Sequence, residues 1–212
     1  MSYNLEEQEQ LAQLRYFWSR WGNHISMAAL VVALGFAGYF GWQWWQRSRA
    51  SDAAVAFEQV QAAIQSNNAE RIKQAWAAMQ AKAPSSAYAG MAALATAKAL
   101  HDAGQNDAAI SALQWAAKNA EGNSERAVAR LNLSALQIDA KQYAEAASTL
   151  ADNPEPSFAP LFDLRRGDLA ALQGQRAAAR KAYDAALKAL PPGAPERQVL
   201  QQRLQAVGGA AA

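Results

Sequence analysis

The chain has 212 residues, 51% of them hydrophobic, and its 20 Lys and Arg nearly balance its 18 Asp and Glu, leaving a net charge of +2. These charges form no basic block and offer little to a phosphate backbone, so we expect no role in nucleic-acid binding. The chain contains no cysteine, which excludes disulfides, thiolate catalysis and cysteine-ligated metals.

A long stretch near the start, from Trp21 to Gln46, contains no Asp, Glu, Lys or Arg. A helix rises about 1.5 Å per residue, so a stretch of this length crosses a hydrocarbon layer roughly 30 Å thick. Tryptophans cluster at both of its ends, where the headgroup layers favour them. We predict an interfacial helix over 1–22, a transmembrane helix over 23–46 and a soluble domain over 47–212.

The direction of this span does not follow from its flanking charges. Arg15 and Arg20 precede it and Arg47 and Arg49 follow it, so the rule that cytoplasmic ends carry more Lys and Arg gives a tie. A cleaved signal peptide would have a shorter apolar region that ends at a small-x-small site. Here the apolar run ends in a pair of tryptophans, which favours an uncleaved signal anchor.

Small residues recur at every fourth position of the predicted span: Ala29, Ala33, Ala37 and Gly41. Positions four apart lie on one face of a helix. Such a smooth stripe lets another membrane helix approach closely, which predicts a contact face for a partner helix. The alternative is that alanine simply fills this membrane helix.

The soluble part is rich in Ala, Leu and Gln and poor in β-branched residues, a composition that favours helix. Clusters of Gly, Pro, Asn and Ser divide it into segments of about 12 to 20 residues. No alternating polar and apolar pattern predicts a strand. The expected class is therefore all-α.

An internal repeat organises these helices. A turn-plus-helix segment that begins at Gly104 recurs from Lys141 and from Gly174, at spacings of 37 and 33 residues. This is close to the 34-residue period of tetratricopeptide repeats. The third copy has the small and large residues that close helix packing needs: Gly167, Ala179, Tyr183 and Ala186. The first copy offers Ala109, Leu113 and Ala116, and the second offers Ala146 and Leu150.

Two segments depart from the repeat pattern. The helices expected at 53–66 and 69–82 form a degenerate pair, and the second copy has Asn153 at a small-residue position and ends in an irregular NPEPSFAP run. We predict an N-terminal transmembrane helix followed by a tetratricopeptide-like α-solenoid, with a plain helical bundle as the alternative.

In such solenoids the inner face, built from the first helix of each pair, usually binds peptide segments. The repeat period places a set of apolar and charged residues on that face: Met91, Leu94, Lys98, His101, Asp102, Val128, Leu131, Asp139, Leu161, Leu164 and Asp168. We predict that they form a partner groove. The competing interpretation of each residue is core or solvated surface.

Motifs for catalysis are not found. The two histidines, His24 and His101, do not form a metal-ligand pattern, and no phosphate-binding glycine loop or nucleophile elbow occurs. We therefore expect no enzyme activity, no metal and no cofactor.

Several segments are characteristic when taken together: LEEQEQLAQLRYFWSRWGNH (5–24), GWQWWQ (41–46), SAYAGMAALATAKALHDAG (86–104), AVARLNLSALQIDAKQYAEAASTL (127–150) and LRRGDLAALQGQRAAARKAYDAAL (164–187). With them the chain resembles the YfgM-type ancillary subunits of the bacterial Sec translocon along nearly its whole length. The more specific marks are Ser86-Ala-Tyr88 and Arg166-Gly167-Asp168. The NPEPSFAPLF linker departs from the resemblance because it is longer and richer in proline.

The resemblance implies a single-pass protein of the cell inner membrane, with a cytoplasmic N-terminus and repeats in the periplasm. It also implies association with the SecYEG channel and with the periplasmic chaperone PpiD. The expected function is an adaptor that binds partners or emerging, unfolded secreted clients and passes them to periplasmic chaperones. The alternative is a scaffold that recruits one folded partner to a cell-envelope or division complex.

Overall fold

The computed structural model describes residues 5–208, with side chains at 11–24 and 26–208. Every regular element in the described range is helical, which confirms the all-α prediction. The chain divides into two compact units, Met1–Ala50 and Ser51–Ala212. No break in the first helix marks the predicted limits at residues 22 and 46, so those limits stay predictions.

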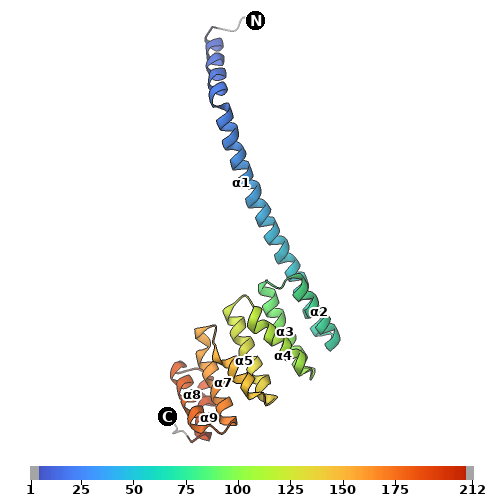
Figure 1. Cartoon of the computed structure of the whole chain (residues 1–212), viewed down its shortest axis with the longest axis vertical. Helices are drawn as coiled ribbons and strands as arrows, with labels where there is room; N and C mark the ends of the chain where they lie inside the picture. The colour runs from blue at the N-terminus through green and yellow to red at the C-terminus, as the bar shows by residue number, and fades with distance from the viewer. Residues whose placement is uncertain (1–4, 209–212) are drawn as a thin grey trace. The chain divides into compact units, whose positions relative to one another are not determined.

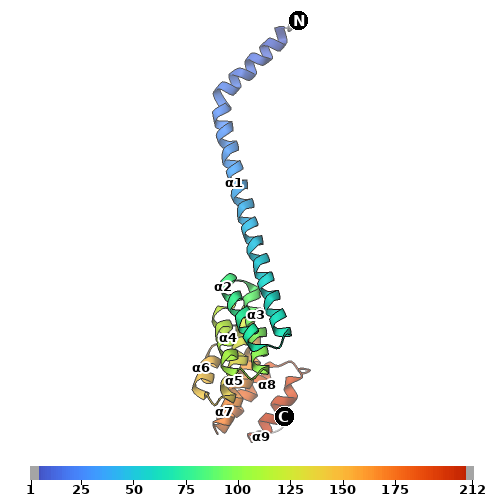
Figure 2. The same cartoon turned by 90° about the vertical axis from the view of Figure 1, so that its right-hand side faces the viewer.

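The first unit consists of the N-terminal part of α1 (Leu5–Gln65), drawn in blue in Figure 1. Figure 2 shows a bend in this helix towards its N-terminal end. Among the described helices, the segment from Ser26 to Gln65 is long and apolar enough to cross a membrane, and none of its apolar window is buried. Its large side chains are exposed, with Val31 at 62% and Leu34 at 63%. These features agree with the predicted transmembrane helix.

The second unit is a series of helix pairs that follow one another from green to red in Figure 1. After the end of α1 it contains α2 (Ala69–Lys82), α3 (Ala87–Asp102), α4 (Asn106–Asn119), α5 (Asn123–Asp139), α6 (Tyr143–Ala151), the 3-10 helix η1 (Pro156–Phe158), α7 (Ala159–Leu172), α8 (Arg176–Ala189) and α9 (Glu196–Ala206). Each helix from α2 onward contacts the next, and α5, the first helix of its pair, also contacts the first helices α3 and α7 of the neighbouring pairs. This arrangement is the expected α-solenoid.

The turns inside three of the pairs have the same geometry, which confirms the repeat. Gly104, Lys141 and Gly174 all have a positive φ, of 73°, 61° and 73°. The next residue donates its N–H to the carbonyl five positions back in each copy, over 2.8 to 2.9 Å. Only glycine adopts this left-handed conformation without steric cost, so Lys141 carries strain that the other two copies avoid.

Small residues dominate the interior of the second unit. The alanines that are 0% exposed include Ala89, Ala92, Ala93, Ala109, Ala116, Ala146, Ala179 and Ala186. The larger residues of the repeat, Leu113, Leu150 and Tyr183, are at most 3% exposed. Alanine lets helices approach closely, and the larger residue fills the gap towards the next helix. The positions identified from the sequence are therefore core positions.

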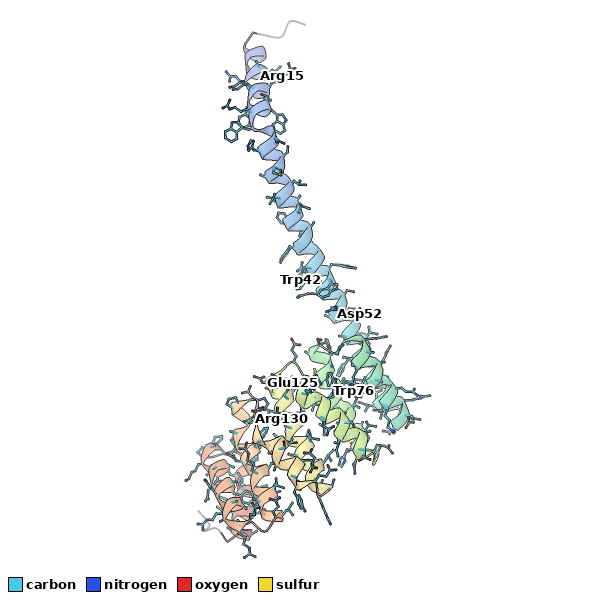
Figure 3. All side chains as sticks on the ribbon, viewed as in Figure 1. Arg15, Trp42, Asp52, Trp76, Glu125 and Arg130 are labelled. Carbon is cyan, nitrogen blue, oxygen red and sulfur yellow. The ribbon has the colours of Figure 1, made fainter. Side chains whose placement is uncertain are left out.

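The earliest pair is also formed. Ala56 and Val60, near the end of α1, lie in one apolar cluster with Trp76 and Met79 of α2. The ring of Trp76, labelled in Figure 3, meets the ring of Trp115 edge-on at 4.9 Å between centroids. The N-cap of α2 is Asn68, whose side chain accepts the backbone N–H of Arg71 at 3.0 Å. The degenerate repeat therefore packs as a helix pair despite its weak motif.

Candidate partner-binding surface

A cavity of about 330 Å³ lies where α3 and α5 meet over α4. Its floor is apolar and is built from Leu94, Ala97, Leu113, Ala135 and Leu136. Ala97 and Leu113 are at most 3% exposed, and the other three are half-buried. The floor thus has room and surface for an apolar side chain of a partner.

The rim of this cavity is polar. Lys98 Nζ pairs with Asp102 Oδ2 at 2.6 Å, with both side chains more than half exposed. His101 Nδ1 lies 2.8 Å from Asn106 Oδ1, and Asn132 and Asp139 complete the rim from α5. Such groups are able to hydrogen-bond the backbone of a segment whose side chain enters the floor. The arrangement suits peptide binding.

The structure brings five of the eleven predicted groove residues together here: Leu94, Lys98, His101, Asp102 and Asp139. Met91 is 48% exposed one turn before Leu94 and does not line the cavity. The cavity residues that sequence reasoning missed are Ala97, Leu113, Asn132, Ala135 and Leu136. Asn132 and Leu136 precede Asp139 by seven and three positions, so helical spacing from Asp139 could have identified them.

Four other predicted groove residues do not line this cavity, and two of them, Leu131 and Leu164, point towards helix contacts. Leu131 packs against the cluster that contains Phe162 and Leu169, and Leu164 packs against the C-terminal cluster. Val128 and Leu161 are half-buried and do not line this cavity. Leu131 and Asn132 are adjacent in sequence, but consecutive helix positions differ by about 100°, so only Asn132 reaches the cavity.

Asp168 is a buried residue that joins three helices, so we leave it out of the partner surface. It is 8% exposed, and it accepts the Tyr183 hydroxyl at 3.0 Å and forms an ion pair with Arg203 of α9. Arg165 lies 3.5 Å from its other carboxylate oxygen. Burial, and next the charge of Asp168, raises the pKa of Tyr183 to about 12. The carboxylate therefore ties α7 to α8 and α9.

The neighbours of Asp168 in the Arg-Gly-Asp segment have packing roles as well. Arg166 donates two hydrogen bonds to the carbonyl of Leu150, at 2.6 and 3.1 Å, near the end of α6. A Cβ on Gly167 would lie 2.4 Å from the ring of Tyr183, so only glycine fits this contact between α7 and α8. Each of the three residues of this segment therefore makes a contact between helices, which gives the segment its characteristic sequence.

The predicted membrane contact residues Ala29, Ala33, Ala37 and Gly41 are all exposed on α1. A Cβ added to Gly41 would meet nothing within 4 Å. The stripe is therefore open, and its use by a partner helix stays a prediction. Among the described residues, no group of three or more His, Asp or Glu could hold a metal ion.

The model of the tetratricopeptide repeat-like domain family matches residues 15–209. The ancillary SecYEG translocon subunit of Neisseria gonorrhoeae is 30% identical over 213 residues, covering 98% of this chain and all of the relative. The proteins of the same name from Haemophilus influenzae and Escherichia coli are 31% and 25% identical, covering 88% and 86% of this chain and 91% and 87% of those relatives. The chain belongs to the family of tetratricopeptide repeat-like proteins that contains these ancillary SecYEG translocon subunits.

Proposed function

We propose that this protein is a non-enzymatic, membrane-anchored adaptor that works beside the SecYEG translocon. The observation that carries the proposal is the cavity between α3 and α5, an apolar floor with a polar rim on a solenoid of this family. The exposed apolar part of α1 supports a membrane anchor. The names of the relatives support the translocon as the place of action.

The proposed topology has the segment 1–22 in the cytoplasm, a single span over 23–46 and the solenoid in the periplasm. In this orientation, the solenoid is held near the exit of the channel. A tether of this kind raises the local concentration of a binding site to about the millimolar range, so weak contacts suffice. No nucleotide is needed, because clients are captured and released by this weak binding alone.

In the proposed mechanism, an unfolded segment leaving the channel lies across α3 and α5. One apolar side chain enters the floor beside Leu94 and Leu136, while the rim groups Lys98 and Asn132 bond to its backbone. The short-lived complex then passes the client to a periplasmic chaperone such as PpiD. Apolar side chains are common in unfolded clients, so this recognition is broad.

Photo-crosslinking tests this function. Asn132, exposed on the rim, is replaced by p-benzoylphenylalanine in cells that secrete several distinct arrested client chains, and Lys181 on α8 provides an exposed control position. We expect crosslinks from position 132 to several clients and to PpiD, and few from position 181. Equal yields from both positions would rule out the cavity as the contact site.

The same experiment separates the adaptor from the scaffold alternative. A scaffold would give one crosslinked folded partner from position 132 whatever client is expressed, and its yield would fall as salt is raised. The adaptor predicts several bands that change with the client and depend little on salt, since an apolar floor carries the contact.

A further inference from the structure

The pair α5 and α6 differs from its neighbours because α6 is short. Helix α6 has nine residues, whereas α4 and α8 each have 14. All three begin directly after the same repeat turn, so the missing length is at the C-terminal end of α6. There the chain turns into the extended conformation at Asp152 and runs into prolines. One side of the end of α4 and of the first half of α5 is therefore left uncovered.

A cavity of about 460 Å³ occupies this uncovered place, between α4, α5 and α6. Three cationic residues line it: Lys118 from α4, and Arg126 and Arg130 from α5, of which Arg130 is labelled in Figure 3. The one carboxylate in its lining is that of Asp152. The lining therefore has two positive charges more than negative ones.

The three cationic residues differ in whether they form a salt bridge. Arg130 Nη1 donates to the carboxylate of Asp152 at 2.7 Å and to its carbonyl at 2.8 Å, so this arginine caps the end of α6. The salt bridges among the described side chains include neither Lys118 nor Arg126.

The guanidinium of Arg126 has the most to gain from a ligand. It donates to Asn123 Oδ1, but its Nε is buried with no hydrogen-bond acceptor in the described part of the chain. The carboxylate of Glu125 turns to the backbone of Gly122, where a Cβ would clash with it. A guanidinium without a carboxylate partner gains a charge-assisted hydrogen bond when an incoming carboxylate binds beside it.

We propose that this cavity binds an acidic, extended segment of a partner protein. A carboxylate side chain would bind between Lys118 and Arg126. The wall also offers Leu133 and Pro154 for an apolar side chain, and Ser148 and Gln114 for backbone groups. A peptide uses all of these groups, whereas a flat lipid surface uses only the charges.

This cavity is separate from the one between α3 and α5. The two cavities share no lining residue, and they use different faces of α5. The inference therefore does not rest on the proposed function, and both sites are available at once. A protein with both sites holds a charged partner on one face and an apolar segment on the other.

The test uses the full chain in phosphatidylcholine nanodiscs and a fluorescein-labelled octapeptide with a central Asp-Leu-Asp. Its control peptide has Asn-Leu-Asn instead. We expect the double variant Lys118→Glu, Arg126→Glu to weaken binding of the acidic peptide about tenfold or more, since both uncompensated charges are reversed. The matched variant Arg176→Glu, Lys181→Glu makes the same charge change at exposed positions of α8, and we expect wild-type binding from it. Fluorescence anisotropy reports the affinities.

Circular dichroism shows whether the double variant is folded. If the double variant is unfolded, the single variant Lys118→Glu, at an exposed position, tests the site instead. Equal binding of both peptides would overturn the proposal, as would equal losses in the two double variants. Displacement by low millimolar inorganic phosphate without discrimination between the peptides would indicate a plain anion site and would also overturn it. No binding of the acidic peptide by the folded wild type has the same consequence.

Discussion

The two units of this protein use apolar residues in opposite ways. In the first, Met1–Ala50, the large apolar side chains that the structure describes are exposed, and no part of the apolar window of α1 is buried. In the second, Ser51–Ala212, the interior is built largely from alanine at close helix contacts. The exposed apolar side chains of the first unit favour an apolar environment such as a lipid bilayer, whereas the apolar side chains of the second unit are buried against one another.

Glycine shows the same contrast. A Cβ on Gly35, Gly38 or Gly41 would meet nothing within 4 Å, whereas a Cβ on Gly167 would lie 2.4 Å from the ring of Tyr183. In the proposed span the space beside each of these glycines is empty, whereas in the solenoid the space beside Gly167 is filled by a neighbouring side chain. Substitutions of one type therefore have different effects in the two units, and this difference is measurable.

The largest expected effect is the loss of membrane attachment in Val32→Arg. A central arginine costs about 2.5 to 3.5 kcal/mol of insertion free energy, which cancels most of what the apolar residues provide. The matched control is Val55→Arg, because Val55 is 50% exposed and Val32 is 57% exposed, but Val55 lies in the second unit. After alkaline carbonate extraction we expect Val32→Arg in the supernatant and Val55→Arg in the pellet. Full retention of Val32→Arg would contradict a single span at this place.

Gly167→Ala should destabilise the solenoid by about 3 kcal/mol, because the new methyl group forces α7 and α8 apart at Tyr183. In an open helix, the same change stabilises by roughly 0.5 to 1 kcal/mol. The control Gly38→Ala, where the Cβ meets nothing, should leave solenoid stability unchanged. Urea titration of the detergent-solubilised full chain, followed by circular dichroism, measures both. A neutral or stabilising Gly167→Ala would show that the helices have room there.

Tyr183→Phe should cost about 1.5 kcal/mol at neutral pH, because it removes the hydrogen bond to the Asp168 carboxylate. Its larger consequence is in alkali. The pKa of Tyr183 is raised from an ordinary 10.0 to about 12, so between these values the unfolded chain has lost a proton that the native chain keeps. The unfolding free energy of the wild type therefore falls as pH rises through this window. The variant lacks the hydroxyl, so its unfolding free energy should not show this fall. Parallel plots of unfolding free energy against pH for the two proteins would contradict the assigned role of Tyr183.

The smallest expected effect is a gain. Lys141→Gly should stabilise the solenoid by about 0.5 to 1 kcal/mol, because the left-handed φ of 61° is strained for lysine. Lys181→Gly, in the middle of α8, should destabilise by about 1 kcal/mol. The same urea titration compares the two. Equal losses in both variants would mean that the turn at Lys141 differs from those at Gly104 and Gly174.

Much of the fold was predictable because its causes are local. The repeat turns at Gly104, Lys141 and Gly174 and the core residues around Tyr183 follow from spacing and residue size, and the structure confirms them. The apolar stretch was predictable from composition alone. These features depend on the residue itself and on neighbours within a few turns.

The candidate surface was only partly predictable, because it depends on which face each helix turns to its neighbours. Leu131 and Asn132 are adjacent in sequence, yet Leu131 packs in the core and Asn132 lines the cavity. The repeat period does not predict which of two adjacent residues faces the cavity. Asp168 has the charge of a surface residue, yet Tyr183 and Arg203, from two other helices, surround it. The basic cavity arises from the early end of α6, which the sequence indicates only as an irregular proline-rich run.

The central claim is that the solenoid works on the outer side of the membrane, where secreted chains emerge. The chain has no cysteine, so Ser124→Cys, at an exposed position of α5, gives a single labelling site. In intact spheroplasts, we expect a membrane-impermeant maleimide to label it fully, with no increase after lysis. Labelling that appears only after lysis would place the solenoid in the cytoplasm and contradict the proposed function.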